Sequence, residues 1–467
     1  MPLTTCPQPP GLRDAIAVSE LFIGVFRRDL IAFYPLGQFE RVESSPLRWS
    51  PASGPDFQMI ERDDRDDRSV AIRLFGAEYR LSSRDGARFT PHDRRMIRAI
   101  GAVLTLRYHH LFQVAHASRL ELYRGGSEDH YVAAFVEPAA YAPPATRVSR
   151  IASTILTLRT AALSTYENRP VSTGALLLGP GDGSGPPVAR TPPDALPYGA
   201  ELTSLKCIHR LCDGARTLFL VDRDGKLAEI IEVERWAGES VGPGEAEVPC
   251  ARAYVAHARA TRSGGHVCLV LSPNHEIKLF AGGEQAFAFA HGRWRILDPS
   301  SKFAIWEDAV ANPVLARVLF QTALDLAESR HGGLFVVVTD PQAAIGRLIA
   351  PHDVLATSGG HDPIGVPPSQ RALHYLARNR GVTELDPCVL EALAGLDGAL
   401  AADRSGRLLA FGAILRHDAA SLPPCAAAAE GARTTAALVA SHFGAVLKIS
   451  QDGIVSCFLD GNRVWDL

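Results

Sequence analysis

Two stretches of this chain share one order of elements, and this internal repeat constrains the fold more than any other feature of the sequence. Each stretch opens with an Ala- and Leu-rich segment and an apolar run that begins at glycine, at Gly174 in the first copy and at Gly333 in the second. In both copies an Asp-x-x-Gly turn then separates two apolar runs, which predicts a β-hairpin. The two turns are Asp222–Gly225 and Asp403–Gly406.

The elements in the second half of the repeat also occur in both copies. A segment that begins with Ala-Arg, at Arg252 in one copy and Arg433 in the other, predicts a helix, and a second pair of apolar runs follows it. Both copies end on a short run that contains tryptophan, Trp294 or Trp465. We therefore predict a tandem duplication of one α+β unit. The alternative is two unrelated units with similar hairpins.

The chain has 467 residues, which is too long for a single hydrophobic core. Its Pro- and Gly-rich segments predict three domains, over residues 1–125, 150–310 and 313–467. The Pro-rich stretch at 138–144 is the main predicted boundary. The predicted fold class is mixed α/β (α+β). It consists of two tandem units, each a mixed central β-sheet flanked by helices, behind a small α+β domain.

The first predicted domain combines short strands with an amphipathic helix. Thr90-Pro91-His92-Asp93 supplies an N-cap, a proline at the first helical position and an acid three residues after the cap. Apolar residues at helical spacing follow. Strands followed by such a helix resemble, over a short stretch, the end of a GAF-type sensory domain.

Composition limits the function classes. The formal net charge is −3, so no global field favours nucleic acid or an anionic membrane surface. No run of about eighteen apolar residues is present to span a bilayer. The start of the chain lacks the basic and apolar regions of a secretory signal. We therefore predict a cytoplasmic protein that binds neither a membrane nor nucleic acid directly.

Motifs in the second copy predict an anion site. A glycine beside Asp397 lets a ligand approach the backbone closely. A helix that opens with Gly431 and Arg433 offers free N–H groups, a positive dipole end and a guanidinium, all of which suit a phosphate. The motifs, in chain order, are Gly332–Val337, Asp397-Gly398-Ala399, Gly431-Ala432-Arg433-Thr434-Thr435 and Gly444–Ser456.

In motif order and spacing, residues 313–467 resemble the diadenylate cyclase domain of the DNA-integrity scanning protein and of the membrane-bound cyclases, a family that makes cyclic di-AMP from two ATP molecules. The resemblance implies a nucleotide site formed by Asp397, Gly398, Ala399, Gly431, Arg433, Thr434 and Thr435. For catalysis, it implies that Asp397 holds Mg²⁺ or Mn²⁺ or accepts a hydroxyl proton, and that Arg433 clamps phosphate. Two such domains must face each other, which implies pairing within one chain or in a homo-oligomer.

The sequence departs from the family at this site. The family's Arg-His-Arg is Arg433-Thr434-Thr435 here, and losing a charged donor to a transferring phosphoryl group costs on the order of 10²-fold in rate. The acid expected after that helix is replaced within Ser441–Gly444, and the usual Pro-Leu-His before Asp-Gly-Ala is Ala394-Gly395-Leu396. We therefore predict a sensor that binds ATP, cyclic di-AMP or a related nucleotide. The alternatives are an active dinucleotide cyclase and a non-catalytic scaffold.

The first copy carries a misleading motif, Asp213-Gly214-Ala215. Aligning the two hairpin turns puts Arg216 opposite Asp397, so the apparent motif is three residues out of register. We therefore predict that residues 150–310 are a degenerate cyclase-like copy that partners residues 313–467. The pairs His352-Asp353 and His361-Asp362 are predicted to be surface groups, or alternatively to line the nucleotide pocket or bind a metal ion.

Overall fold

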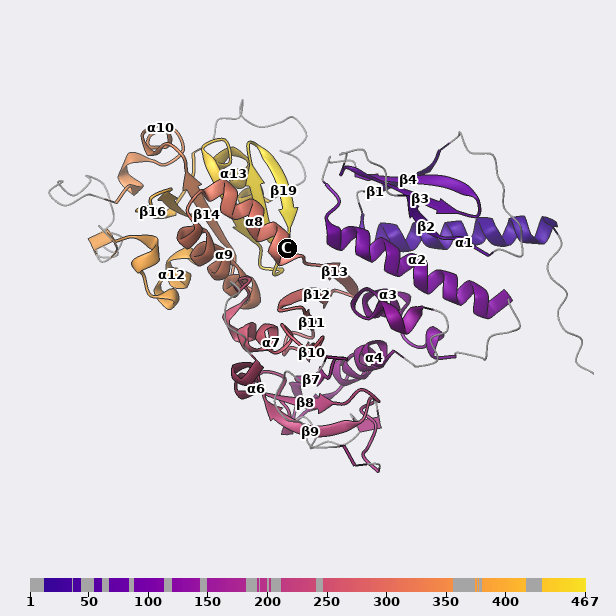
Figure 1. Cartoon of the computed structure of the whole chain (residues 1–467). Helices are drawn as coiled ribbons and strands as arrows, with labels where there is room; N and C mark the ends of the chain where they lie inside the picture. The colour runs from indigo at the N-terminus through magenta and orange to yellow at the C-terminus, as the bar shows by residue number, and fades with distance from the viewer. Residues whose placement is uncertain are drawn as a thin grey trace, which may run out of the picture. The chain divides into compact units, whose positions relative to one another are not determined.

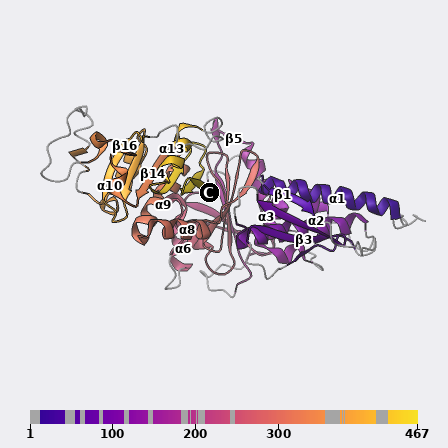
Figure 2. The same cartoon turned by 90° about the horizontal axis from the view of Figure 1, so that it is seen from above.

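The computed structural model shows two compact units, which are considered separately (Figures 1 and 2). Unit 1 contains Met1–Pro243 and Ala256–Leu297, and unit 2 contains Gly244–Val255 and Asp298–Leu467. The expected mixed α/β fold class is confirmed, whereas the division into three domains stays a prediction. The described residues are 12–35, 37–42, 54–60, 67–83, 88–112, 120–142, 149–181, 191–192, 194–199, 201–202, 211–240, 247–355, 374–375, 377, 380–416 and 431–467.

The first part of unit 1 is an antiparallel sheet with two long helices. Its strands run in the order β1-β4-β3-β2. Helix α2 begins as the sequence predicts, because Asp93 N–H donates to Thr90 Oγ1 at 3.2 Å and Thr90 N–H donates to Asp93 Oδ2 at 2.7 Å. The elements are α1 (Leu12–Phe33), β1 (Gly37–Arg41), β2 (Gln58–Ile60), β3 (Ser69–Leu74), β4 (Ala77–Ser83) and α2 (Pro91–Phe112).

A second, larger sheet completes unit 1. Its strand order is β13-β12-β11-β10-β7-β8-β9, and only β7 and β8 are parallel neighbours among these strands. The elements are η2 (Leu120–Tyr123), α3 (Ser127–Val136), η3 (Pro138–Tyr141), α4 (Arg150–Ala162), β5 (Thr165–Tyr166), β6 (Arg169–Pro170), β7 (Thr173–Leu177), β8 (Thr217–Val221), β9 (Leu227–Glu232), α6 (Val233–Ser240), α7 (Val255–Ala260), β10 (Val267–Leu271), β11 (Ile277–Ala281), β12 (Glu284–Ala290) and β13 (Arg293–Ile296).

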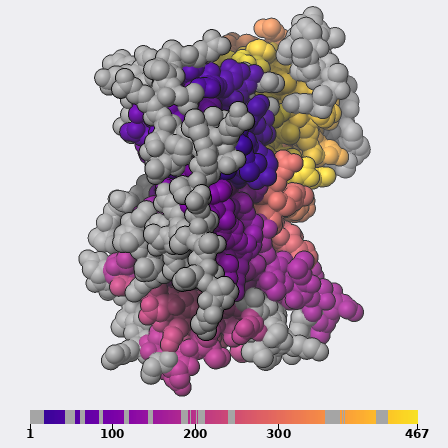
Figure 3. All heavy atoms as spheres, turned by 90° about the vertical axis from the view of Figure 1, so that its right-hand side faces the viewer, coloured from indigo at the N-terminus to yellow at the C-terminus, as the bar shows by residue number. Residues whose placement is uncertain are grey.

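A hydrophobic core joins the two sheets of unit 1, running from Phe26 in α1 to Trp294 in β13. A buried carboxylate adds to it. Asp129 of α3 is 1% exposed and accepts from Arg159 of α4 at 2.6 Å and from Trp294 Nε1 at 2.7 Å. The guanidinium of Arg159 also lies 4.0 Å from the ring centre of Phe289. In the space-filling view, the indigo N-terminal residues lie beside the purple residues of the same unit (Figure 3).

Unit 2 is built on a six-stranded sheet in the order β16-β15-β14-β17-β18-β19. Leu334 and Val336 of β14 pack on one face against Ala437 of α13, and α9 and α12 cover the other face. The elements are η5 (Arg252–Tyr254), α8 (Pro299–Val310), α9 (Pro313–Glu328), β14 (Gly333–Val338), α10 (Pro341–Ala344), η6 (Pro351–Asp353), η7 (Val382–Glu384), α12 (Pro387–Ala394), β15 (Ala399–Asp403), β16 (Leu408–Ala413), α13 (Ala432–Ala440), β17 (Gly444–Ile449), β18 (Val455–Leu459) and β19 (Asn462–Asp466).

The two larger sheets repeat one topology. In each, an inner strand (β7 or β14) has a parallel neighbour that leads into an antiparallel edge strand, and an antiparallel neighbour on its other side. Both copies do end on a strand that contains tryptophan, as the sequence predicts, but these two strands do not occupy equivalent positions. By position in the sheet β19 corresponds to β12, so Trp294 lies on an additional strand and does not match Trp465. The β12–β13 hairpin adds this strand at the sheet edge.

Candidate functional site

Asp397 and Arg433 meet at the edge of the unit 2 sheet where β14 and β15 begin. Asp397 lies two residues before Ala399, the first residue of β15, and Arg433 is the second residue of α13. Arg433 Nη2 lies 3.4 Å from Asp397 Oδ1. The Asp397 side chain is 99% exposed and that of Arg433 is 35% exposed. The structure therefore brings together the two residues that the sequence singled out for chemistry.

A second glycine makes room for Arg433. A Cβ on Gly332 would collide with Nη1 of Arg433 and lie 3.0 Å from its Cζ. The guanidinium therefore lies directly over the backbone that leads into β14. Only glycine leaves this space open.

The fold itself requires a glycine at position 398. Its φ is +110°, and a Cβ there would lie 2.5 Å from the carbonyl carbon of Gly412 in β16. The close approach that the sequence assigned to a ligand is thus made by the neighbouring strand. Ala399 is 1% exposed and packs in the sheet core. Neither residue offers a side chain to a ligand, so their part in a site is to fix the backbone beside Asp397.

A second cation, which was not among the predicted site residues, contacts the first turn of α13 from strand β17. Lys448 Nζ donates to Thr434 Oγ1 at 2.8 Å, and Thr434 is only 4% exposed. Lys448 lies on β17 opposite Leu334 of β14. Its signal in the sequence is a lysine within the otherwise apolar run of Gly444–Ile449. Thr434 is thus committed to a cation inside the protein, while Thr435 is half-buried.

The N-terminus of α13 is open in the described part of the chain. Gly431 is its N-cap residue, with extended backbone (φ −62°, ψ 162°), and no described side chain caps the helix. The first backbone N–H groups of a helix have no partner within the helix, so they attract anions. This edge of the sheet thus combines a helix N-terminus, two cations and one exposed carboxylate.

A metal ion at this edge would need a bound phosphate in addition to the protein's own side chains. The described residues contain no group of three or more His, Cys, Asp or Glu side chains that could hold a metal ion. Mg²⁺ is commonly held by one or two carboxylates together with substrate phosphates. Asp397 therefore fits Mg²⁺ or Mn²⁺ only as a single carboxylate beside a bound phosphate.

Ser441, in the turn after α13, has a role in the fold. Ser441 Oγ donates to the Leu438 carbonyl at 2.7 Å and accepts from Gly461 N–H at 2.9 Å. It thereby ties the end of α13 to the turn between β18 and β19.

Two His-Asp pairs were predicted near the pocket or on the surface. His352 Nε2 lies 3.7 Å from Asp353 Oδ1, and the His352 side chain is 58% exposed. Their turn packs against the edge strand β16, where Leu355 N–H donates to the Leu409 carbonyl at 2.8 Å. The pair His361-Asp362 lies outside the described residues.

The register of unit 1 places Arg216 where unit 2 has Asp397. Ala175 pairs with Phe219 as Phe335 pairs with Leu400, and counting back three residues reaches Arg216 and Asp397. The match of Ala175 with Phe335 follows from aligning the two hairpin turns, whereas aligning the glycines Gly174 and Gly333 would bring Thr217 opposite Asp397. The first copy therefore has the opposite charge at this position.

The apparent motif of the first copy is a structural turn. Asp213 Oδ1 accepts from the N–H groups of Ala215 and Arg216 at 2.9 and 2.8 Å. Burial raises the pKa of Asp213, but these backbone hydrogen bonds outweigh it and leave the pKa lowered. Beneath the turn, His257 Nε2 lies 2.9 Å from the Gly214 carbonyl, and burial lowers the pKa of His257 to about 4.

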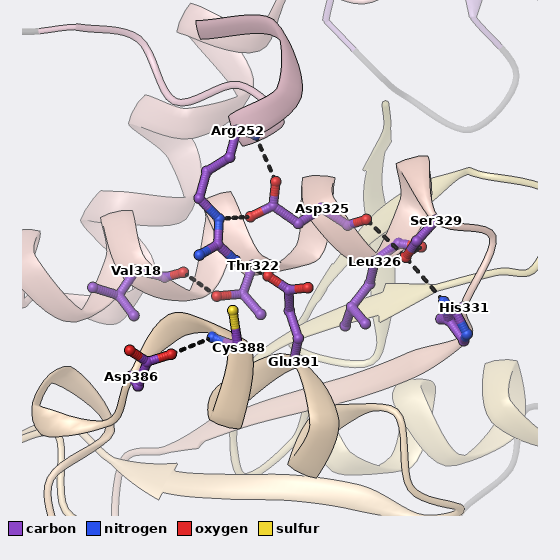
Figure 4. A network of polar contacts seen from close by, with 10 residues as sticks. All are labelled: Arg252, Val318, Thr322, Asp325, Leu326, Ser329, His331, Asp386, Cys388 and Glu391. Carbon is purple, nitrogen blue, oxygen red and sulfur yellow. Dashed lines mark hydrogen bonds and ion pairs between the residues drawn. The ribbon is translucent and has the colours of Figure 1, made fainter. Parts of the chain in front are cut away.

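Arg252, which the sequence aligns with Arg433, lies in unit 2 and is bound to acidic side chains (Figure 4). Its backbone N–H and its Nε donate to the two carboxylate oxygens of Asp325, at 2.6 and 2.9 Å, and its Nη2 pairs with Glu391. Burial raises the pKa of Asp325, although the bonds from Arg252 oppose that shift. Arg252 is thus part of an internal ion-pair cluster with Asp325 and Glu391.

Comparisons with known proteins add no function. No protein-family model matches the chain, and no curated protein matches it. A crystal structure titled as the hypothetical membrane spanning protein from Bacillus cereus is similar at 19% identity over 35% of this chain and 69% of that chain, with a TM-score of 0.24. Among the described residues of the present chain, no helix combines the length and the hydropathy needed to cross a membrane.

Proposed function

We propose that unit 2 is the ligand-binding part of a cytoplasmic nucleotide sensor, and that it binds ATP, cyclic di-AMP or a related adenine nucleotide. The observation that carries this proposal is the exposed pair of Asp397 and Arg433 across the backbone of Gly332. Exposed ion pairs contribute little to folding. This exposed pair is therefore better explained by a ligand than by a contribution to stability.

The phosphates of such a ligand would lie at the N-terminus of α13. Arg433 offers bidentate donors, the helix adds N–H groups and its positive dipole end, and Lys448 adds charge close by. Lys448 partly offsets the cation and imidazole that this sequence lacks relative to the family it resembles. Asp397 would face the ribose or a phosphate-bound cation.

Sensing is favoured over synthesis because the two copies differ in charge. Closing a cyclic dinucleotide needs two competent half-sites, and the first copy has Arg216 in place of the carboxylate. Arg252, which aligns with Arg433 in the sequence, lies in unit 2 and is engaged there by Asp325 and Glu391. Synthesis stays the alternative, and it would require the unit 2 faces of two chains to pair in a homo-oligomer.

Titration calorimetry of the whole chain with ATP, ADP and cyclic di-AMP tests the proposal. We expect binding of at least one of them, a loss of affinity of about tenfold or more in Arg433→Gln, and wild-type affinity in Arg463→Gln. The control removes an equally exposed arginine, whose Nη1 lies 3.6 Å from Asp466 on β19 of the same unit. Absence of binding by all three nucleotides would refute the proposal.

Mass spectrometry separates sensing from synthesis. The chain is incubated with ATP and Mn²⁺, and the products are compared with those of Asp397→Asn. We expect bound nucleotide to be recovered unchanged. Formation of cyclic di-AMP by the wild type and its loss in the variant would establish the cyclase alternative instead.

A further inference from the structure

A short segment of unit 2 is pinned to helix α9. This segment, residues 247–255, belongs to the unit 2 stretch Gly244–Val255, whose sequence neighbours Pro243 and Ala256 belong to unit 1. Arg252 is its central contact, because both its backbone N–H and its side chain bond to Asp325. The contacts with α9 are those of the Glu247 carbonyl with Arg317, of Arg252 with Asp325 and of Tyr254 with Glu328.

Arg252 extends this connection from α9 to α12. While its Nε bonds to Asp325, its Nη2 pairs with Glu391, so one guanidinium holds acids from two helices (Figure 4). The side chains of Asp325 and Glu391 are 9% and 29% exposed. Ion pairs shielded in this way are worth more than freely exposed ones.

Glu391 lies in the last turn of α12, six residues before Asp397. Its carbonyl oxygen accepts from Gly395 N–H at 2.9 Å, where α12 ends. Asp397 follows two residues later, and Gly398 is then held against the backbone of Gly412. The backbone of Asp397 is thus fixed on one side by the end of α12 and on the other by the contact between β15 and β16.

We propose that Arg252 is a positioning residue for the candidate nucleotide site. It holds the last turn of α12 against α9 through Glu391 and so keeps the Asp397 carboxylate opposite Arg433. Displacing the segment 247–255 releases Glu391 and loosens Asp397, which couples the state of this segment to ligand affinity. The identity of the ligand rests on the proposed function, whereas the positioning of Asp397 does not.

Hydrogen–deuterium exchange of the whole chain without ligand tests the positioning directly. Arg252→Gln leaves its backbone N–H bond to Asp325 in place, and Glu391→Gln is a nearly isosteric change. In each variant we expect amides 395–399 to exchange about fivefold faster, with amides 444–449 of β17 unchanged. Arg463→Gln, the matched control, should leave both regions at wild-type rates. Unchanged exchange of amides 395–399 in both variants would overturn the proposal.

Calorimetry with ATP tests the coupling to the site. We expect the dissociation constant to rise about threefold to tenfold in either single variant, and the double variant to be no weaker than the weaker single one, because both changes break the same link. Faster exchange with unchanged affinity would also overturn the positioning role. If the wild type binds no adenine nucleotide, the proposed function fails, and the exchange rates still decide whether Arg252 positions Asp397.

Discussion

Replacing Gly398 with alanine tests how the candidate site is built. The backbone φ of Gly398 is +110°, and an added Cβ would lie 2.5 Å from the carbonyl carbon and 2.7 Å from the carbonyl oxygen of Gly412. A left-handed backbone costs alanine about 1–2 kcal/mol, and overpacking adds about 1–3 kcal/mol. Neither clashing atom belongs to a flexible side chain, so the two costs add. We expect Gly398→Ala to destabilise unit 2 by on the order of 3 kcal/mol.

Thermal unfolding followed by circular dichroism measures this loss, which corresponds to a Tm lower by about 6–12 °C. Gly381→Ala is the control, since its φ is −75° and the nearest atom to its new Cβ would be 3.5 Å away. The control should change stability by no more than about 0.5 kcal/mol. A Gly398→Ala protein with wild-type Tm and lost nucleotide binding would refute this reasoning, because the glycine would then serve the ligand alone.

Further predictions concern both units. Gly332→Ala should weaken ATP binding about tenfold with little change in Tm, measured by calorimetry and thermal unfolding, because its new Cβ displaces the Arg433 guanidinium; unchanged affinity would show that the clearance is not needed for binding. Asp129→Ala should cost unit 1 about 3–5 kcal/mol in urea unfolding, because it leaves the Arg159 guanidinium without its buried partner; a loss below about 1 kcal/mol would contradict this assignment. Burial lowers the pKa of His257 from 6.5 to about 4, so as the pH falls the unfolded chain binds this proton before the folded chain does. The free energy of unfolding is therefore not reduced by His257 above pH 6.5. It falls as the pH drops below that value and levels off below about pH 4. His257→Gln should flatten this dependence, which amounts to about 3 kcal/mol, in urea titrations between those pH values.

Local sequence patterns were sufficient where neighbouring residues decide the structure. The reciprocal hydrogen bonds of Thr90 and Asp93 were readable from four consecutive residues. The hairpin turns at Asp222 and Asp403 were readable too, and their alignment placed Arg216 opposite Asp397. Capping and turn preferences are short-range, so they survive in any tertiary context.

Other assignments failed because they depend on strands that are distant in sequence. Trp294 and Trp465 both lie in terminal strands of their copies, yet an additional hairpin strand separates their positions in the sheets. Lys448 was overlooked because its importance comes from Thr434, fourteen residues away along the chain and adjacent only in the folded unit.

The sequence by itself determined the repeat and the order of its elements, because patterning and turn chemistry are local. It also predicted that Asp397 and Arg433 belong to one site. Only the tertiary structure decided what the residues around that pair do. It showed that Gly398 is required by Gly412, that Gly332 leaves room for Arg433, and that Arg252 pairs with Asp325 and Glu391. Steric clearance and ion pairing act through space between segments far apart in the chain, so no local pattern records them.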